Sequence, residues 1–324
     1  MRGEDWSRTA TSGTTFQRTR HHMVETVGIV GVGIMGSAMA RNLHAAGFAV
    51  VGYDPSAAAC ARLEEVGGRA LASPRAVAEA ADIIILSLPN ADALAAAVSG
   101  PDGMARAAGS GQIAIECSTL PLAAKRAAHT EMALAAKVLL DCPVSGTGAQ
   151  AVTKDLVVFA SGDEAAFVRC AGVFAGMSRA QRYLGPFGNG SIMKYIANHL
   201  VTIHNVAAAE AMLLGVKAGL DPAVVYDTLA DSAGTSRMFQ VRGPLMRDSA
   251  YDMPTATIRT HLKDVGIISA FAAELGCALP VYQAATQLYM AGEALGFGAR
   301  DTASVCAVLE AMHGIDRGGR GEPS

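Results

Sequence analysis

Short apolar runs alternate with longer alanine-rich stretches over the first half of the chain. Six of these runs predict β-strands, and a segment long enough for a helix usually separates one run from the next. The first four runs show no regular polar alternation, as expected of strands that helices cover on both faces. Strands separated by helix-length segments imply parallel pairing with right-handed crossovers, and therefore a doubly wound sheet. The predicted strands cover residues 27–30, 49–53, 83–88, 113–116, 138–141 and 156–160.

The pattern changes after the glycine-rich segment 185–190. Beyond it there is little convincing strand pattern, and helices are expected instead. Asp221 and Pro222 are typical of the start of a helix, which places the end of a long preceding helix just before them. We therefore predict an α/β N-terminal Rossmann-type domain followed by an all-α C-terminal domain. The other clear helices are expected over 191–218, over 257–275 and after Pro280.

This change divides the 324 residues into four predicted segments. Residues 1–22 are rich in Arg, Ser, Thr and His and lack apolar periodicity, so a disordered leader is expected. A transit peptide is the alternative, against which Glu4 and Asp5 count. The Rossmann domain is then expected over 23–186, the helical domain over 187–318 and a flexible tail over 319–324.

Composition and charge exclude several classes of protein. With 51% hydrophobic and 17% charged residues, the chain is typical of a globular protein. A net charge of −3 gives no electrostatic reason to expect nucleic acid or an anionic membrane as a partner. No apolar run approaches the roughly 18 residues that span a bilayer. The six scattered cysteines and the histidines show no spacing typical of a disulfide framework or a metal site. We therefore expect a cytoplasmic protein without a metal.

The sequence Gly31-Val-Gly33-Ile34-Met35-Gly36 follows the first predicted strand and opens a helix. In a dinucleotide-binding turn, the first glycine permits the tight turn, the second lets pyrophosphate approach the backbone and the third lets helix pack on strand. The phosphates then accept hydrogen bonds from unpaired N–H groups at the helix N-terminus. An ordinary glycine-rich turn is the alternative, but the position within a βαβ unit favours dinucleotide binding.

Asp54 ends the second predicted strand, 18 residues after Gly36. An acidic residue there binds the hydroxyls of the adenosine ribose and repels a 2′-phosphate. No arginine directly follows it, so NAD is favoured over NADP as the cofactor. A simple turn before Pro55 is the alternative role of Asp54.

Four separated segments carry further motifs: GIVGVGIMG at 28–36, DCPVSGT at 141–147, GNGSIMKYIAN at 188–198 and LKDVG at 262–266. In this order they resemble the β-hydroxyacid dehydrogenase family, which lies within the 6-phosphogluconate dehydrogenase superfamily and includes 3-hydroxyisobutyrate dehydrogenase-like enzymes. The resemblance extends from 24 to about 312. It implies an NAD(P)-dependent enzyme that acts on the CH–OH group of a small 3-hydroxy carboxylate.

The resemblance also implies roles for particular residues. Lys194 is expected to exchange a proton with the substrate oxygen, and Asn198, one helical turn later, to hold the substrate and orient the lysine. The loop Ser145-Gly146-Thr147 is expected to bind the substrate carboxylate. The family has glycine where Thr147 stands, so the identity of the substrate does not follow from any named member. A solvated lysine, a buried structural asparagine and a strand-ending turn are the alternatives.

The resemblance places Leu88, Pro89 and Thr119 in loops that line the cofactor, and Lys263 near the nicotinamide. A local turn at Thr119 and a surface position for Lys263 are the alternatives. The expected function is reversible hydride transfer between NAD and a small hydroxy acid or the matching semialdehyde, in a homodimer or homotetramer. An imine reductase, an enzyme for a phosphorylated sugar acid and a non-catalytic dinucleotide-binding module are the alternative functions.

Overall fold

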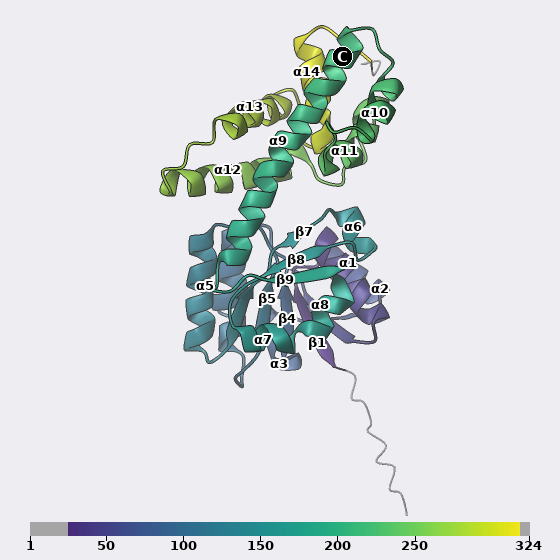
Figure 1. Cartoon of the computed structure of the whole chain (residues 1–324). Helices are drawn as coiled ribbons and strands as arrows, with labels where there is room; N and C mark the ends of the chain where they lie inside the picture. The colour runs from purple at the N-terminus through teal and green to yellow at the C-terminus, as the bar shows by residue number, and fades with distance from the viewer. Residues whose placement is uncertain (1–24, 318–324) are drawn as a thin grey trace, which may run out of the picture.

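The computed structural model describes residues 25–317, so the expected leader over 1–22 and tail over 319–324 lie outside the described residues. An α/β body and a helical body lie one above the other, and the long helix α9 (Asn189–Lys217) runs from the first into the second (Figure 1). The prediction of a Rossmann-type α/β region followed by a helical region is confirmed.

Six parallel strands form the main sheet, in the order β3-β2-β1-β4-β5-β6. Successive residues of β1 enter the two cores on opposite faces, because side chains alternate along a strand. Ile29, for example, packs in one core and Val30 in the other, which explains why the strands show no polar alternation. The strands are β1 (Thr26–Val30), β2 (Ala49–Tyr53), β3 (Arg69–Ala70), β4 (Ile83–Leu86), β5 (Ile113–Glu116) and β6 (Val138–Asp141).

Helices cover both faces of this sheet. The core on one face contains side chains of α1, α2 and α8, such as Met39, Leu63 and Phe174. The core on the other face contains side chains of α3, α4 and α5, such as Leu94 and Met132. The helices of this half are α1 (Ile34–Ala45), α2 (Ala57–Glu65), α3 (Pro74–Ala80), α4 (Ala91–Ser99), α5 (Leu122–Leu134), α6 (Gly148–Val152), α7 (Glu164–Arg169) and α8 (Ala171–Met177).

A second, three-stranded sheet differs from the sequence prediction. It consists of β7 (Val144–Ser145), β8 (Val157–Ala160) and β9 (Ala180–Tyr183), and β7 pairs antiparallel with β8. The strands β3, β7 and β9 were not predicted. Two residues, as in β3 and β7, are too few to show any periodicity, and β9 has the sequence AQRY, which is not an apolar run. The strand expected at 83–88 ends at Leu86. The N–H of Leu88 donates a hydrogen bond to the hydroxyl of Ser118 and not to a neighbouring strand.

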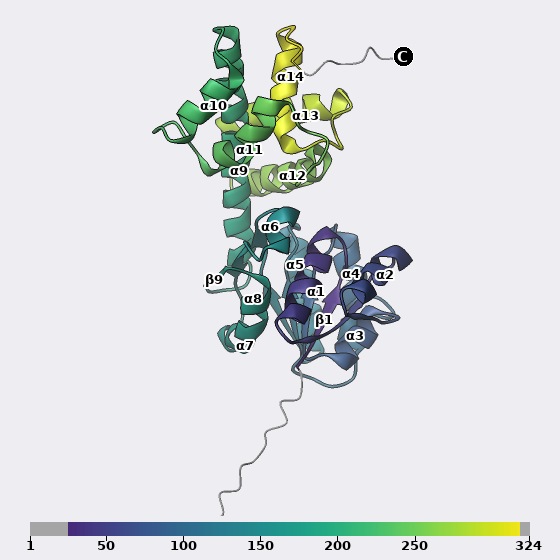
Figure 2. The same cartoon turned by 90° about the vertical axis from the view of Figure 1, so that its right-hand side faces the viewer.

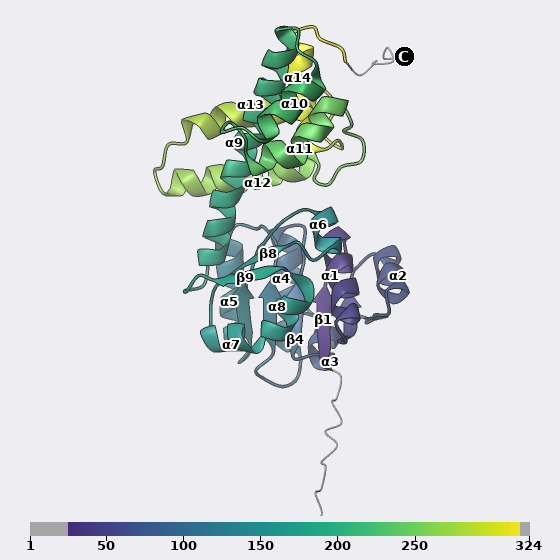
Figure 3. The ribbon, with the colours of Figure 1, turned by 45° about the vertical axis from the view of Figure 1, so that its right-hand side comes forward.

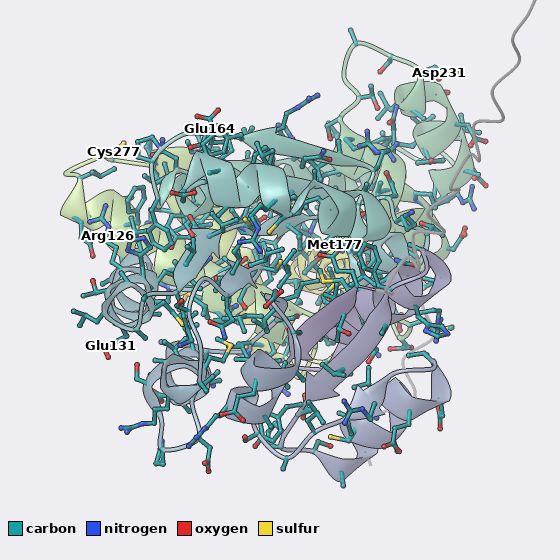
Figure 4. The ribbon with its side chains drawn as sticks, turned by 90° about the horizontal axis from the view of Figure 1, so that it is seen from below. Arg126, Glu131, Glu164, Met177, Asp231 and Cys277 are labelled. Atoms are coloured by element: carbon teal, nitrogen blue, oxygen red, sulfur yellow. The ribbon has the colours of Figure 1, made fainter. Side chains whose placement is uncertain are left out.

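The helical half is built around α9, against which the other five helices pack. Figure 2 shows α10, α11 and α14 beside its upper part, whereas Figure 3 shows α12 and α13 projecting to one side. Helix α11 was not predicted from the pattern, since it contains Gly243 and Pro244. The helices are α10 (Pro222–Ala230), α11 (Arg237–Asp248), α12 (Ile258–Glu274), α13 (Pro280–Ala294) and α14 (Val305–Met312). Seen from below, Cys277 lies at the outer end of the α12–α13 hairpin and Met177 lies in the interior (Figure 4).

Helix α9 is long and apolar enough to cross a membrane by length and composition alone. It also carries buried polar side chains with partners in the helical half. The amide of Asn205 donates to the hydroxyl of Tyr289 and to the carbonyl of Thr302. The hydroxyl of Thr202 lies 2.9 Å from Nε2 of His261 on the next helix but two, α12. These contacts are those of the core helix of a folded domain.

Candidate active site

A cavity of about 1080 Å³ lies between the two halves, at the carboxyl ends of the parallel strands. Ligands of open α/β sheets bind at this edge, where loops after adjacent strands diverge. The walls come from the loops after β1, β2, β4 and β5 in the α/β half. The helical half contributes the segment 254–257 and one face of α12, and α9 contributes Lys194.

The glycine-rich turn after β1 forms part of this wall. Gly31 has φ +91°, and a Cβ there would lie 2.2 Å from the carbonyl oxygen of Ser87. A Cβ on Gly36 would lie 2.0 Å from the carbonyl oxygen of Gly31, so α1 packs directly on the turn. In contrast, nothing lies within 4 Å of the Cβ position of Gly33, which faces the cavity. Helix α1 begins at Ile34 without a side-chain cap, so its first N–H groups suit a pyrophosphate.

Asp54 lies at the end of β2 and lines the same cavity. One carboxylate oxygen accepts a hydrogen bond from the N–H of Val32 (2.8 Å), and the other accepts from the N–H of Ser56 (2.9 Å). Asp54 therefore joins the glycine-rich turn to the loop after β2. A carboxylate oxygen has more than one lone pair, so both oxygens can still accept from a ribose.

Lys194 lies in the second turn of α9 and is 9% exposed. Burial lowers the pKa of Lys194 below the ordinary value of a lysine. The carboxylate of Asp264 opposes this shift, while the positive charges of Lys263 and Lys125 add to it. A buried amine with a lowered pKa at the wall of a cavity is suited to proton transfer near neutral pH.

A chain of polar contacts joins Lys194's helix to α12 and to the α/β half. The amide nitrogen of Asn198 donates to Asp264 (2.8 Å), and the ammonium of Lys263 lies 3.3 Å from the same carboxylate. Lys263 also donates to the carbonyl oxygen of Thr119 (2.7 Å) in the loop after β5. The two halves are therefore held together beside Lys194.

The loop at 145–147 has a local structure that the sequence did not suggest. Thr147 is the N-cap of α6, and its hydroxyl accepts a hydrogen bond from the N–H of Gln150. The side chain of Gln150 in turn accepts from the N–H of Thr147 (3.0 Å), which completes a capping box. The backbone N–H of Thr147 is therefore occupied, whereas its side chain still lines the cavity.

Two family models match the chain. The model described as the NAD binding domain of 6-phosphogluconate dehydrogenase matches residues 26–185. The model described as NAD-binding of NADP-dependent 3-hydroxyisobutyrate dehydrogenase matches residues 188–309. The chain is also 32% identical to L-threonate dehydrogenase of Cupriavidus necator over 301 residues, which cover 93% of this chain and all of that protein. The chain belongs to the β-hydroxyacid dehydrogenase family.

Other members of the family support the same assignment. The mitochondrial 3-hydroxyisobutyrate dehydrogenase of Homo sapiens is 31% identical over 87% of this chain and 86% of its own length. The crystal structure of a 3-hydroxyisobutyrate dehydrogenase from Salmonella typhimurium superposes with a TM-score of 0.79 at 32% identity, over 88% of this chain and 99% of the other. The chain therefore carries the NAD(P)-binding domains of a family whose relatives named here are dehydrogenases of hydroxy acids.

The structure of this family member brings most of the residues singled out from the sequence to one cavity. Gly36, Ser145 and Asn198 lie beside the cavity without lining it. Gly36 packs on the turn, and the amide of Asn198 is directed to Asp264. The lining residues are Gly31, Gly33, Ile34, Met35, Asp54, Leu88, Pro89, Thr119, Gly146, Thr147, Lys194 and Lys263.

Sequence reasoning did not include some residues that line this site. Asp264 stood next to Lys263 in the quoted motif, and that motif was the available signal. The segment 254–257 had no signal, because it lies between helices and carries no motif. Among residues 25–317 there is no group of three His, Cys, Asp or Glu side chains placed to hold a metal ion.

Proposed function

We propose that the chain catalyses reversible hydride transfer between NAD and the hydroxyl-bearing carbon of a small 3-hydroxy carboxylate, or reduction of the matching semialdehyde. Lys194 is the general acid and base. The observation that carries this proposal is the buried amine of Lys194 at the wall of the cavity, with its pKa lowered by burial. The relatives named above support a hydroxy-acid substrate.

The cofactor would lie along the glycine-rich turn, with its pyrophosphate over Gly33 and the N-terminus of α1. The ribose hydroxyls would bind Asp54, and the loops at Leu88, Pro89 and Thr119 would cover the nicotinamide half. The cofactor supplies the hydride acceptor in this reaction. The small number of cations in the cavity wall supports NAD over NADP. Among the described residues, only two Lys or Arg side chains line the cavity, Lys194 and Lys263. Lys263 donates a hydrogen bond to the carbonyl oxygen of Thr119, in the loop after β5. Asp54 follows β2, on the other side of β1, so Lys263 is not beside Asp54, where a 2′-phosphate would bind.

During oxidation, the unprotonated amine of Lys194 takes the proton of the substrate hydroxyl while the hydride leaves the carbon that bears this hydroxyl. During reduction, the ammonium returns that proton to the carbonyl oxygen. The hydrogen bond from the Asn198 amide to the Asp264 carboxylate fixes the two side chains beside the amine. The substrate carboxylate binds at the loop formed by Ser145, Gly146 and Thr147, where the Thr147 hydroxyl and the backbone N–H of Gly146 at the cavity wall suit an anion.

Two threonines of the cavity wall favour a substrate with a further hydroxyl. Thr147 lines the cavity from α6, and Thr260 lines it from α12, one turn before Asp264. A site that hydrogen-bonds a substrate hydroxyl rejects the analogue that lacks it. The name of the relative that acts on L-threonate, a polyhydroxylated acid, supports this choice.

The alternative functions receive less support. A phosphorylated acid needs several cations around its phosphate, and the described cavity wall offers Lys194 and Lys263. A non-catalytic binding module has no need of a buried lysine with a lowered pKa. We also propose that the chain is cytoplasmic and that it forms a homodimer or homotetramer. The assembly is supported by exposed apolar side chains along α9: Met193, Ile196, Leu200 and Leu214.

The test is a panel of hydroxy acids that includes L-threonate and 3-hydroxyisobutyrate, assayed with NAD and with NADP for formation of the reduced cofactor. We expect kcat/KM to be highest for an acid with a second hydroxyl and at least tenfold higher with NAD. Lys194→Ala should bind NAD as before and lose about 10²–10⁴-fold in kcat. A Lys194→Ala variant with unchanged kcat would refute the role of Lys194, and a preference for NADP would refute that of Asp54.

A further inference from the structure

A buried ion cluster lies next to the site, at the carboxyl ends of β5 and β6. The ammonium of Lys125 on α5 lies 2.5 Å from Glu116 and 2.8 Å from Asp141, and all three side chains are 0% exposed. Burial alone would lower the pKa of Lys125, but the two carboxylates raise it above its ordinary value. One cation therefore faces two anions. Because buried charge is costly unless its remaining lone pairs are satisfied, the carboxylates need further donors.

Helix α9 supplies the further donors to Asp141. One oxygen of this carboxylate accepts from the backbone N–H of Ser191 (2.7 Å), and the other accepts from the hydroxyl of Ser191 (2.7 Å). The hydroxyl of Ser161, which itself bonds Asp141, accepts from the N–H of Gly190 (2.9 Å). These N–H groups belong to the first turn of α9, where a helix has no internal acceptors.

The residue before α9 cannot cap the helix itself, because the N-cap residue is Gly188 and it has no side chain. The cap therefore comes from strands of the α/β half, distant in sequence. A negative carboxylate at this end also interacts favourably with the helix dipole. A Cβ on Gly190 would lie 2.3 Å from the carbonyl oxygen of Phe159 and 2.6 Å from that of Asp141, so the first turn sits directly on the two strands.

Lys194 follows Ser191 by three residues and so lies on the same face, one turn along. The hydroxyl of the next residue, Tyr195, donates to the carbonyl of Leu120 in the loop after β5 (2.5 Å). The position of the Lys194 amine relative to the cofactor-binding strands is therefore set where α9 meets Asp141. A displacement of about 1 Å at a reacting group is enough to lower a rate by about 10²-fold.

We propose that Asp141, held by Lys125, is a positioning residue for Lys194: its buried carboxylate caps α9 from the other half of the molecule and fixes the amine against the cavity. The inference rests on the proposed role of Lys194. If the cluster served stability alone, its disruption would lower the melting temperature without acting through the lysine.

Asp141→Asn is the principal variant, since it keeps the shape and one acceptor but loses the charge. We expect kcat for hydroxy-acid oxidation to fall at least tenfold, with the Kd for NAD changed less than twofold. Glu116→Gln is the matched control. Glu116 pairs with the same lysine and accepts from the N–H of Ser118, so both of these partners lie outside α9. Its loss of kcat should be at least fivefold smaller, and equal losses in the two variants overturn the proposal.

A double-mutant cycle with Lys194→Ala separates positioning from stability. The slow turnover of the Lys194→Ala background is measured at high enzyme concentration through absorbance of the reduced cofactor. If Asp141 acts through Lys194, Asp141→Asn lowers kcat less than twofold in that background. The same factor in both backgrounds overturns the positioning role, whereas an unchanged kcat in Lys194→Ala alone refutes the proposed function.

If Asp141→Asn does not fold, Ser191→Ala replaces it in the same cycle. This variant removes the hydroxyl that donates to Asp141 and keeps the backbone N–H bond. We expect a threefold or larger loss of kcat that disappears in the Lys194→Ala background. An unchanged kcat for Ser191→Ala in an enzyme with Lys194 overturns the proposal.

Discussion

Lys194 lies near charged side chains of both signs, and its pKa depends on each of them. Burial lowers the pKa of Lys194, Asp264 raises it, and Lys263 and Lys125 lower it further. Lys263 also pairs with Asp264, and this pairing reduces the effect of the Asp264 carboxylate on the pKa of Lys194. At the scale of single residues, the function proposed for Lys194 therefore depends on a neighbour that need not touch the substrate.

Lys263→Met should raise the pKa of Lys194, because it removes a positive charge and leaves Asp264 unpaired. Oxidation requires the unprotonated amine, so the acid limb of the kcat/KM profile for oxidation should move to higher pH. The profile is measured from pH 5 to 10 with the best acid of the panel. Lys263→Arg keeps the charge and should leave the limb in place. A limb that stays put or moves to lower pH in Lys263→Met contradicts this account.

The loop proposed to bind the substrate carboxylate leads into a short helix that depends on its cap. Helix α6 has five residues, and the capping box between Thr147 and Gln150 satisfies N–H groups at its start. The amide nitrogen of the Gln150 side chain donates to Asp155 (3.0 Å), which itself pairs with Arg179. The loop proposed to bind the substrate carboxylate is therefore fixed by side chains that do not line the cavity.

Gln150→Ala should free the N–H of Thr147 and loosen this loop. We expect the KM for the hydroxy acid to rise about three- to tenfold, or roughly 0.7–1.4 kcal/mol, which lies within the range that a helix cap contributes, while the KM for NAD stays within twofold. Steady-state kinetics at saturating NAD measure the effect. Asp163→Ala removes the N-cap of α7, outside the cavity, and serves as the matched control. Equal changes in both variants would mean that the capping box contributes stability only.

At the scale of the whole molecule, an apolar stripe remains exposed on the helix that joins the two halves. Ile196 is 50% exposed and Leu200 47%, and the exposed apolar residues of α9 recur at helical spacing on one side. The α12–α13 hairpin projects beyond the rest of the helical half (Figure 3). Exposed apolar surface of this kind is typical of an interface between subunits.

The wild-type chain should therefore sediment as a dimer or tetramer at micromolar concentration. Replacing Leu200 by Glu should shift it towards one chain, because the interface would bury an unpaired carboxylate. Analytical ultracentrifugation measures both. Leu134→Glu, at a leucine that is 79% exposed on α5, should leave the assembly unchanged. A wild-type protein that sediments as a single chain contradicts the proposed oligomer.

The amino-acid pattern is enough to predict the layered organisation of the protein, its glycine-rich turn and the helix that carries Lys194. The parallel strands, the glycine turn after β1 and the long helix carrying Lys194 follow from periodicity and motif, which are properties of consecutive residues. Short strands such as β3 and β7 leave no periodicity to detect, and α11 contains residues that usually interrupt helices.

The residues that support Lys194 are brought together by folding and cannot be predicted from the local pattern. Asp141 and Ser191 are 50 residues apart in sequence, and Asn198 and Asp264 are 66 apart. A lysine side chain is rarely fully buried, yet the fold buries Lys125 between two carboxylates. Such contacts depend on where parallel strands end and on how α9 docks against them. The local pattern carries no record of these distances, and so the cap of α9 appears only once the chain is folded.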